Sequence, residues 1–414
     1  MKKTSGTMFV SCMVLSVATT ALADELPSRE EMWKLLQQQQ REIIALKKQL
    51  ETTTPSQPPQ VTQSTPETQP EKINRSGLKW SDRISFSGTV EVEANWNNNH
   101  DGDLTTPKQN TSDVTVATAE LVTDVKINPW VSGQVVLLHE EDGPDKEVDL
   151  DQATITIGNA EVTPFFFTGG LMTLPFGSYD TLMVTDPLGL DLGETQESAL
   201  QLGFNTSYYS GSFYLFNGEA EKVAKDSHLI GYGGNLAYNR EYDFGTVHLG
   251  TDLISAIEDS DGLTDSDLDE TTMFKHIPGL SLHARLDVAS WTGLAEYVTA
   301  LKKMDTSEIL WNADGARPWA VNTELGYTWD IMGYATTAAA GYQQTGEAGG
   351  LMMPQHRLRG GLKITLFENT DIALEWNHDK DYKTGDSSSV EGGAVRTGTG
   401  TTSDSATMQL AVGF

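Results

Sequence analysis

The sequence predicts an all-β protein: an antiparallel transmembrane β-barrel of about sixteen strands, with a helix and a linker ahead of it. Two observations carry this prediction. From about residue 81 onward, segments of roughly ten residues alternate apolar and polar side chains, so each predicted strand has two different faces. Every second connection between these segments is tight, and the others are long and polar. An even strand count with this alternation is typical of outer-membrane barrels, whose turns and loops lie on opposite sides.

Residues 1–23 have the pattern of a secretory signal peptide. Lys2 and Lys3 precede the apolar stretch "TMFVSCMVLSVATTA", and Ala21-Leu22-Ala23 is a small-residue cleavage pattern. The alternative is an uncleaved anchor. Cleavage would remove Cys12, the single cysteine of the chain, so the mature protein is expected to have no disulfide.

Residues 24–52 predict a coiled-coil helix, and residues 53–80 a Pro/Thr/Gln-rich linker. Ser28 and Glu31 form a capping box. Apolar residues then recur at steps of four and three, which indicates either a short coiled coil in a trimer or a lone amphipathic helix. The linker has almost no apolar side chains and is expected to be disordered.

The region 81–414 is predicted to be the barrel. In "ISFSGTVEVEANW", Phe86, Val90 and Val92 share one face, and Glu91 and Glu93 lie on the other. Tight turns are predicted at sites such as 210–211 and 292–293. A secreted β-sandwich would explain the alternation, but not the loop asymmetry, the aromatic residues near strand ends or the terminal Phe, which is similar to an outer-membrane assembly signal.

Charge and motifs exclude several functions. The net charge of -30 argues against a nucleic-acid partner. The mean hydropathy of -0.34 argues against a bundle of membrane helices. The sequence contains no G-x-S-x-G, H-E-x-x-H or P-loop motif, and its eight histidines are scattered. We therefore predict no enzyme activity, no cofactor and no metal site.

A sixteen-stranded barrel is too wide for its own side chains to fill, so an aqueous lumen is expected. The alternation points charged side chains toward it. The predicted wall residues are Glu91, Glu93, Glu120, His283, Arg285, Arg357, Arg359 and Lys363. Two interpretations remain open: the basic residues form a patch that holds a polyanionic solute, or they pair with lumenal carboxylates.

One long connection departs from the alternating pattern. It reads "GGLMTLPFGSYDTLMVTDPLGLDLGETQESALQLGF" and spans residues 169–204. With the strand layout around it, this segment resembles the LbtU-type siderophore porin family. The resemblance covers most of 80–414, and it implies a sixteen-stranded outer-membrane barrel that admits a ferric siderophore.

The same segment supplies the predicted constriction. Its apolar residues favour packing, so residues 174–196 are expected to fold into the lumen. The alternative is a lid outside it. Four acidic residues would face the basic wall residues and create a transverse field: Asp186, Asp191, Glu194 and Glu197.

The leading functional hypothesis is passive uptake of an anionic ferric chelate across the Gram-negative outer membrane, with the N-terminal region in the periplasm. Residues 24–80 leave no room for the folded plug of an energised receptor. The alternatives are a general porin for small ions, sugars or phosphate, an outer-membrane hydrolase, and a tether that grips the cell wall through residues 28–51. Expected partners are outer-membrane lipid, the solute and two further copies in a homotrimer.

Overall fold

A computed structural model describes residues 83–99, 109–140, 148–218, 229–264, 275–390 and 395–414. The predicted signal peptide (1–23), coiled-coil helix (24–52) and linker (53–80) lie outside the described residues. Those three predictions therefore stay predictions.

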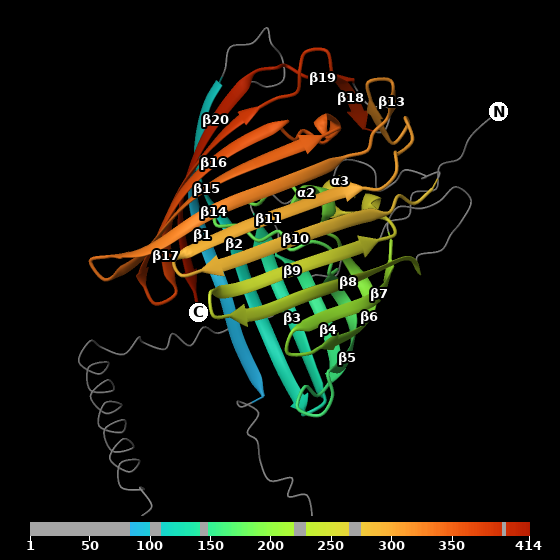
Figure 1. Ribbon diagram of the computed structural model, residues 1–414, viewed down its shortest axis with the longest axis vertical. Coiled ribbons are helices and arrows are strands. Elements are labelled where there is room, and N and C mark those ends of the chain that lie inside the picture. Colours follow the sequence, from blue (N-terminus) through green and yellow to red (C-terminus); the bar gives the residue numbers. More distant parts are fainter. Residues whose placement is uncertain (1–82, 100–108, 141–147, 219–228, 265–274, 391–394) are drawn as a thin grey trace, which may run out of the picture. The chain divides into compact units, whose positions relative to one another are not determined.

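Sixteen antiparallel strands form a closed barrel, which confirms the predicted fold class (Figure 1). Each strand pairs with the next, and the last pairs with the first through contacts such as Trp96 with Ala406. The barrel strands are β1 (Ile84–Asn99), β2 (Gln109–Asn128), β3 (Val131–Glu140), β4 (Asp149–Gly158), β5 (Phe165–Thr173), β6 (Gln196–Asn205), β7 (Tyr209–Asn217), β8 (Leu229–Tyr242), β9 (Gly245–Ile254), β10 (Gly279–Val288), β11 (Trp291–Ala300), β14 (Trp319–Ile331), β15 (Tyr334–Gly346), β16 (His356–Phe367), β17 (Thr370–Lys380) and β20 (Thr402–Gly413).

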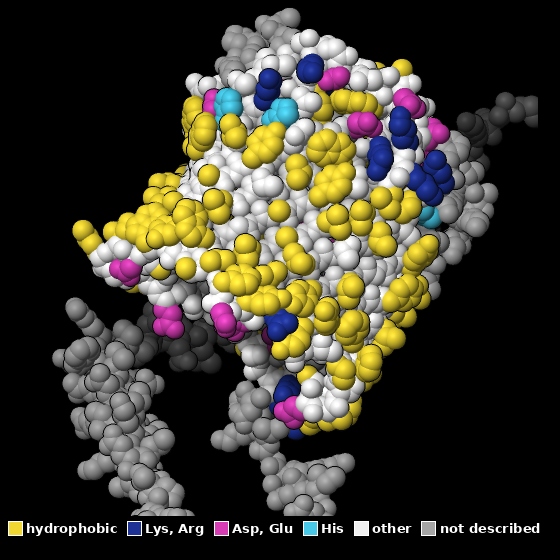
Figure 2. Space-filling model, viewed as in Figure 1, with side chains coloured by type: hydrophobic (Ala, Val, Ile, Leu, Met, Phe, Trp, Pro, Cys, Tyr) yellow, Lys and Arg dark blue, Asp and Glu magenta, His cyan; other side chains and the backbone are white. Residues whose placement is uncertain are grey.

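The outer surface of the barrel is apolar. Phe86 is 64% exposed and Leu202 is 61% exposed, and apolar side chains spread over the face seen in Figure 2. On β10, Leu282 and Leu286 are exposed, and the intervening His283 faces inward, as the period of two predicts. Such a surface is stable against lipid. Within the described residues, no helix is long and apolar enough to cross a membrane.

Two of the predicted tight turns are wrong. Residues 210–211 lie inside β7, and residues 292–293 lie inside β11. The true turn before β7 is closed by Thr206, whose hydroxyl accepts the N–H of Tyr209 at 3.0 Å. The turn before β11 contains Ala289 with φ of 53°. Ser-Gly and Thr-Gly pairs signal turns in sequence, but here the ladder continues through them.

Two long connections pair to form a second sheet that the sequence did not predict. It has the order β13 (Asp314–Gly315), β12 (Ile309–Trp311), β18 (Ser387–Val390) and β19 (Arg396–Thr397). Trp311 packs edge-on against Tyr382 at 5.0 Å between ring centroids. The Tyr382 hydroxyl hydrogen-bonds with the Thr345 hydroxyl at 2.7 Å, which ties this sheet to the end of β15.

An apolar core fills part of the barrel interior. The connection from β5 to β6 contributes Leu174, Phe176 and Leu192, and the wall contributes inward side chains such as Phe216 of β7 and Val298 of β11. In the part of the chain that the structure describes, the connections contain four short helices: α2 (Leu190–Gly193), η2 (Ile257–Asp259), α3 (Asp261–Leu263) and η4 (Gly349–Leu351). The helices α2 and α3 contact each other, and residues of both line the largest space of the interior described below.

Candidate functional site: a cavity between the wall and an inner segment

The β5–β6 connection, residues 174–195, is called the inner segment here. Its backbone is held by carboxylates on the inner face of the barrel wall. The N–H of Gly177 donates to Asp252 of β9 at 3.0 Å. The N–H groups of Ser178 and Tyr179 each donate to Glu296 of β11 at 2.8 Å. These acceptors are inward-facing residues of separate strands, so the segment crosses the wall from strand to strand.

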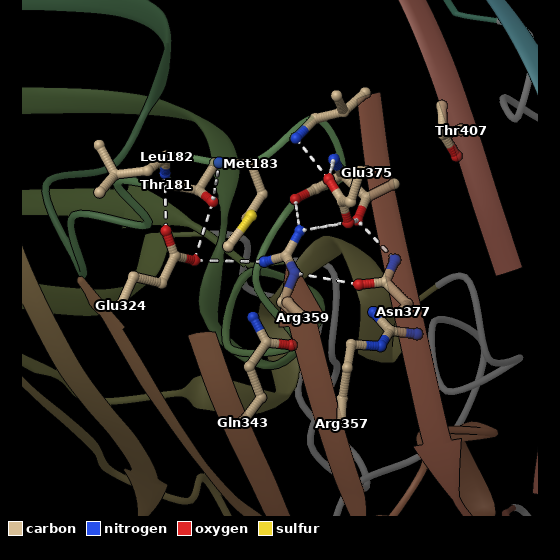
Figure 3. Close-up of polar contacts among 12 residues, drawn as sticks. Thr181, Leu182, Met183, Glu324, Gln343, Arg357, Arg359, Glu375, Asn377 and Thr407 are labelled. Carbon is tan, nitrogen blue, oxygen red and sulfur yellow. Dashed lines mark hydrogen bonds and ion pairs between the residues drawn. The ribbon is translucent and has the colours of Figure 1, made fainter. Parts of the chain in front are cut away.

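The same pattern continues on the next strands (Figure 3). Glu324 of β14 accepts the N–H of Leu182 at 2.6 Å and the hydroxyl of Thr181 at 2.9 Å. Glu375 of β17 accepts the N–H of Thr185 at 2.9 Å and its hydroxyl at 2.6 Å. We name Asp252, Glu296, Glu324 and Glu375 the wall carboxylates. All four are buried, with 3%, 7%, 4% and 4% of their surface exposed.

Arg359 of β16 lies between two of the wall carboxylates, with its side chain fully buried. Its guanidinium reaches Glu324 at 3.3 Å and Glu375 at 3.0 Å. It also donates to the Thr185 hydroxyl at 2.7 Å and to Asn377 at 3.3 Å (Figure 3). This arginine therefore neutralises buried carboxylates and joins the inner segment to the wall.

Two further predicted basic residues are also paired. Arg357 donates twice to Asp379, at 2.7 and 2.9 Å. Arg285 donates twice to Asp287, at 2.8 and 3.2 Å. With Arg359, these contacts favour paired charges over the open basic patch that the sequence also allowed.

A cavity of about 1340 Å³ lies between the inner segment and the strands at the two ends of the barrel sequence. Its described lining is strongly acidic, with eleven carboxylate residues: Glu91, Glu93, Asp113, Glu120, Glu140, Asp151, Asp186, Asp191, Glu194, Asp261 and Asp371. Lys363 is the basic residue among the described lining. The inner segment adds an apolar strip of Leu182, Met183, Val184 and Leu190.

The predicted site residues therefore fall into four groups. Seven line the cavity: Asp186, Asp191, Glu194, Glu91, Glu93, Glu120 and Lys363. Glu197 instead lies in β6 and is buried. His283 and Arg285 line a separate pocket of about 10 Å³, where His283 stands 3.3 Å from Asp252. Arg357 and Arg359 are absent from the described linings of both spaces.

Sequence reasoning missed the wall carboxylates. Each has the inward parity of its strand, as Glu296 has in "WTGLAEYVTA". That parity could have identified them as lumenal acids. Nothing local distinguishes an acid that holds the inner segment from one that faces the cavity.

Two carboxyl groups of the inner segment have strongly shifted pKa values. The Asp191 side chain reaches cavity water but is enclosed by the barrel, and burial raises its pKa to about 6, with Arg357 opposing and Asp186 adding to the rise. Burial raises the pKa of Glu194 to about 7, helped by the charges of Asp261 and Asp186. Burial likewise raises the pKa of Asp186, against the nearby Arg359 charge. The cavity charge therefore changes near neutral pH.

Within the described residues, no group of three or more His, Cys, Asp or Glu side chains is arranged to hold a metal ion. The cavity contains many carboxylate oxygens, but they are spread along its wall and do not gather around one point.

The closed barrel with a long connection packed against its inner wall places the protein in the porin-type fold class. Solved structures with this fold include Pseudomonas putida OprB, with a TM-score of 0.53 at 11% identity over 81% of this chain and 95% of that one. An anion-selective porin from Comamonas acidovorans has a TM-score of 0.52 at 13% sequence identity, over 80% of this chain and 99% of that one. Salmonella typhi OmpF, in a complex with daunomycin, has a TM-score of 0.50 at 12% sequence identity, over 80% of this chain and 97% of that one. Identities this low show the fold alone.

No family model matches the chain. Among curated proteins, it is similar to a UPF0422 protein of Coxiella burnetii, 29% identical over 309 residues, which is 72% of this chain and 65% of that protein. It is also similar to the UPF0422 protein lpg2959 of Legionella pneumophila, 27% identical over 364 residues, 80% of this chain and 66% of that protein. The chain thus spans slightly less than two thirds of these relatives. The resemblance to LbtU-type siderophore porins stays a prediction.

Proposed function

We propose that the protein is a non-enzymatic, passive diffusion channel of the Gram-negative outer membrane, and that the inner segment is its constriction. The observation that carries the proposal is the acidic cavity, bounded by the barrel wall on one side and by the inner segment on the other. The apolar exterior supports the membrane location. We further propose that the long connections face outward and that the N-terminal region lies in the periplasm.

The cavity charge supports a preference for cationic and neutral solutes. Eleven carboxylates against one lysine, among the described lining residues, give a negative potential inside low-dielectric walls. Rings of Asp and Glu side chains favour cations in channels. The raised pKa values of Asp191 and Glu194 reduce this charge, but leave it negative.

We also propose, more specifically, that the solute is a siderophore, and the acidic cavity limits which net charge such a chelate can carry. The sequence favoured an anionic chelate held by basic wall residues. Because Arg285, Arg357 and Arg359 pair with neighbouring acids, we now propose a chelate of neutral or positive net charge. A general porin for small cations and sugars is the second candidate, favoured by the size of the cavity, about 1340 Å³.

The test is ion selectivity in planar bilayers. Under a KCl gradient, the purified full chain should give a reversal potential close to that of an ideal potassium electrode. A reversal potential that indicates chloride preference would contradict the acidic-cavity proposal.

Solute identity needs a second experiment. A deletion strain grown under iron limitation should respond differently to neutral, cationic and anionic ferric chelates. Rescue by the neutral or cationic class alone supports siderophore uptake, and equal growth of mutant and parent on every chelate leaves the general porin as the better proposal.

Two proposals concern assembly. The homotrimer would show as a threefold mass in cross-linked native membranes. Cell-wall contact through residues 28–51 would show as binding to purified peptidoglycan that is lost when those residues are removed.

A further inference from the structure

A row of very small residues crosses three neighbouring strands of the barrel wall. Gly326 of β14 is the cross-strand partner of Ala339 of β15, which is in turn the partner of Gly361 of β16. The row is bounded by Thr292 of β11 and by Glu375 of β17. Glycine inside a strand often marks a place where another part of the chain approaches closely. We name Gly326, Ala339 and Gly361 the wall trough.

Two side chains of the inner segment fill this trough. A Cβ atom added to Gly326 would stand 2.7 Å from Cδ1 of Leu182. A Cβ atom added to Gly361 would stand 2.8 Å from Sδ of Met183. Real Cβ atoms essentially never make contacts shorter than 3.0 Å. Leu182 and Met183 therefore occupy the space that inward side chains of the wall would otherwise take.

The polar contacts at the same place also depend on a small residue. Glu324, which accepts the N–H of Leu182 at 2.6 Å, lies two strands away from its ion-pair partner Arg359 (Figure 3). Gly341 of β15 stands between them, as the cross-strand partner of both. A Cβ atom at Gly341 would lie 3.0 Å from Cγ of Glu324. The ion pair thus crosses β15 over a residue that has no side chain.

The inner segment is anchored on both sides of the residues that fill the trough. Before them, the N–H of Ser178 donates to Glu296 at 2.8 Å, and after them the N–H of Thr185 donates to Glu375 at 2.9 Å. The wall cannot recede, because β14, β15 and β16 are paired on both edges within the closed barrel. The depth of the trough therefore decides how far the middle of the segment extends toward the cavity.

We propose that the wall trough sets the width of the channel at its constriction, and that Gly326 and Gly361 are positioning residues that act through Leu182 and Met183. This inference rests on the proposed function, in which the inner segment is the constriction. Leu182, Met183 and Val184 line the cavity, so any displacement of these residues away from the wall takes space from it. The trough carries no charge. It therefore controls the size of the solutes that pass and leaves the preference for cations to the carboxylates.

The test fills the trough and measures the pore of the purified full chain in planar bilayers. In Gly326→Leu, single-channel conductance should fall by roughly twofold, because a side chain forced into a filled site displaces the chain that covers it. The largest polyethylene glycol that enters the pore should become smaller. The reversal potential under a KCl gradient should equal that of the parent, since no charge changes. Gly326 is absent from the described lining of the cavity, so the new leucine does not itself obstruct it.

Two further variants separate an effect of the trough from damage to the barrel. Gly360→Leu is the matched control: Gly360 precedes Gly361 on β16, pairs with the outward-facing Trp376, and a Cβ atom there would meet nothing within 4 Å. It should conduct like the parent. The double variant G326L and L182G moves one leucine side chain from the segment to the wall at the same total volume. It should restore the conductance and the size limit of the parent.

The outcomes distinguish this inference from the proposed function. If G326L conducts as well as the parent or better, or if its loss of conductance persists in the double variant, the trough does not set the width of the channel. The proposed function is tested separately, by replacement of residues 178–192 with a Gly-Ser linker. Unchanged conductance after that replacement contradicts the constriction itself. Raised conductance after it, together with a G326L variant that matches the parent, contradicts only the role of the trough.

Discussion

Two parts of the barrel wall carry acidic residues on their inner faces and use them differently. On β9, β11, β14 and β17, the wall carboxylates are buried beneath the inner segment and accept its N–H groups. On β1 and β2, Glu91, Glu93 and Glu120 face the cavity. The residue type and the strand parity are the same. What differs is whether a second piece of chain covers the carboxylate, and this decides between a structural and a solute-facing charge.

The stability of the covered wall, the strands whose carboxylates lie beneath the inner segment, depends on each buried charge having hydrogen-bond and ion-pair partners. A buried carboxylate with charged and N–H partners contributes about 1.5–3 kcal/mol per bond, whereas an unpartnered buried charge is strongly destabilising. Arg359, Glu324 and Glu375 therefore form one connected group of buried charges. The open wall needs no such matching, because cavity water solvates its charges.

Removal of the inner segment should abolish the difference between the two walls. Replacement of residues 178–192 by a short Gly-Ser linker should raise single-channel conductance severalfold. The inner segment would no longer narrow the lumen, and water would solvate the wall carboxylates that it now buries. Single-channel recording checks this, and circular dichroism controls for an intact barrel. Unchanged conductance and selectivity would falsify the constriction proposal.

Loss of one wall carboxylate should affect the covered wall alone. Glu375→Ala removes the acceptor of Thr185 and leaves Arg359 short of one partner, with an expected loss of about 3–5 kcal/mol in the docking of the segment. Open-channel noise should rise and the segment should become accessible to protease. Glu93→Ala is the matched control on the open wall, and equal proteolysis of both variants is the contrary result.

Charge removal on the open wall should change selectivity and leave the segment in place. The triple variant E91Q, E93Q and E120Q should lower the cation over anion permeability ratio several-fold, since three cavity charges are lost. Reversal potentials measure this ratio. An unchanged ratio would show that these carboxylates lie away from the solute path.

The inner segment should add a pH dependence to the cavity. Glu194, with a pKa of about 7, and Asp191, with a pKa of about 6, are ionised at pH 8 and gain protons as the pH falls through those values. Cation selectivity should therefore decrease between about pH 8 and pH 5, above the range where ordinary carboxyl groups titrate. The double variant D191N and E194Q should lack this step, and a step that persists in it must arise elsewhere.

The smallest expected effect concerns Lys363, the basic residue among the described cavity lining. Lys363→Met should raise the preference for cations slightly, since one positive charge among eleven carboxylates is removed. An unchanged preference would show that Lys363 lies away from the solute path, and a fall in cation preference would contradict the expected repulsion between this lysine and the permeating cations.

The sequence predicted the barrel well because its signals are local. Alternation assigned the face of Leu282 and His283, and the short and long connections gave the strand count. The second sheet escaped because β13 and β19 are each two residues long, too short for any period to show. Cavity residues such as Asp186 were predicted from a local break in the pattern.

The covered wall could not be predicted in the same way. Burial of Arg359 depends on Glu324 and Thr185, which are 35 and 174 residues away in the chain. No periodicity links such positions. The sequence therefore identified the charges of the lumen but not which of them pair.

The order of the inner segment and its acceptors along the chain has a consequence for assembly. The backbone N–H groups of Gly177, Ser178 and Thr185 donate to carboxylates that follow them in the sequence by 75, 118 and 190 residues. Every wall carboxylate follows the segment that it holds. Since contacts between distant residues form slowly, docking of the segment should be a late event, completed only after β17 joins the wall. During that interval the nascent barrel is a wider pore than the finished one.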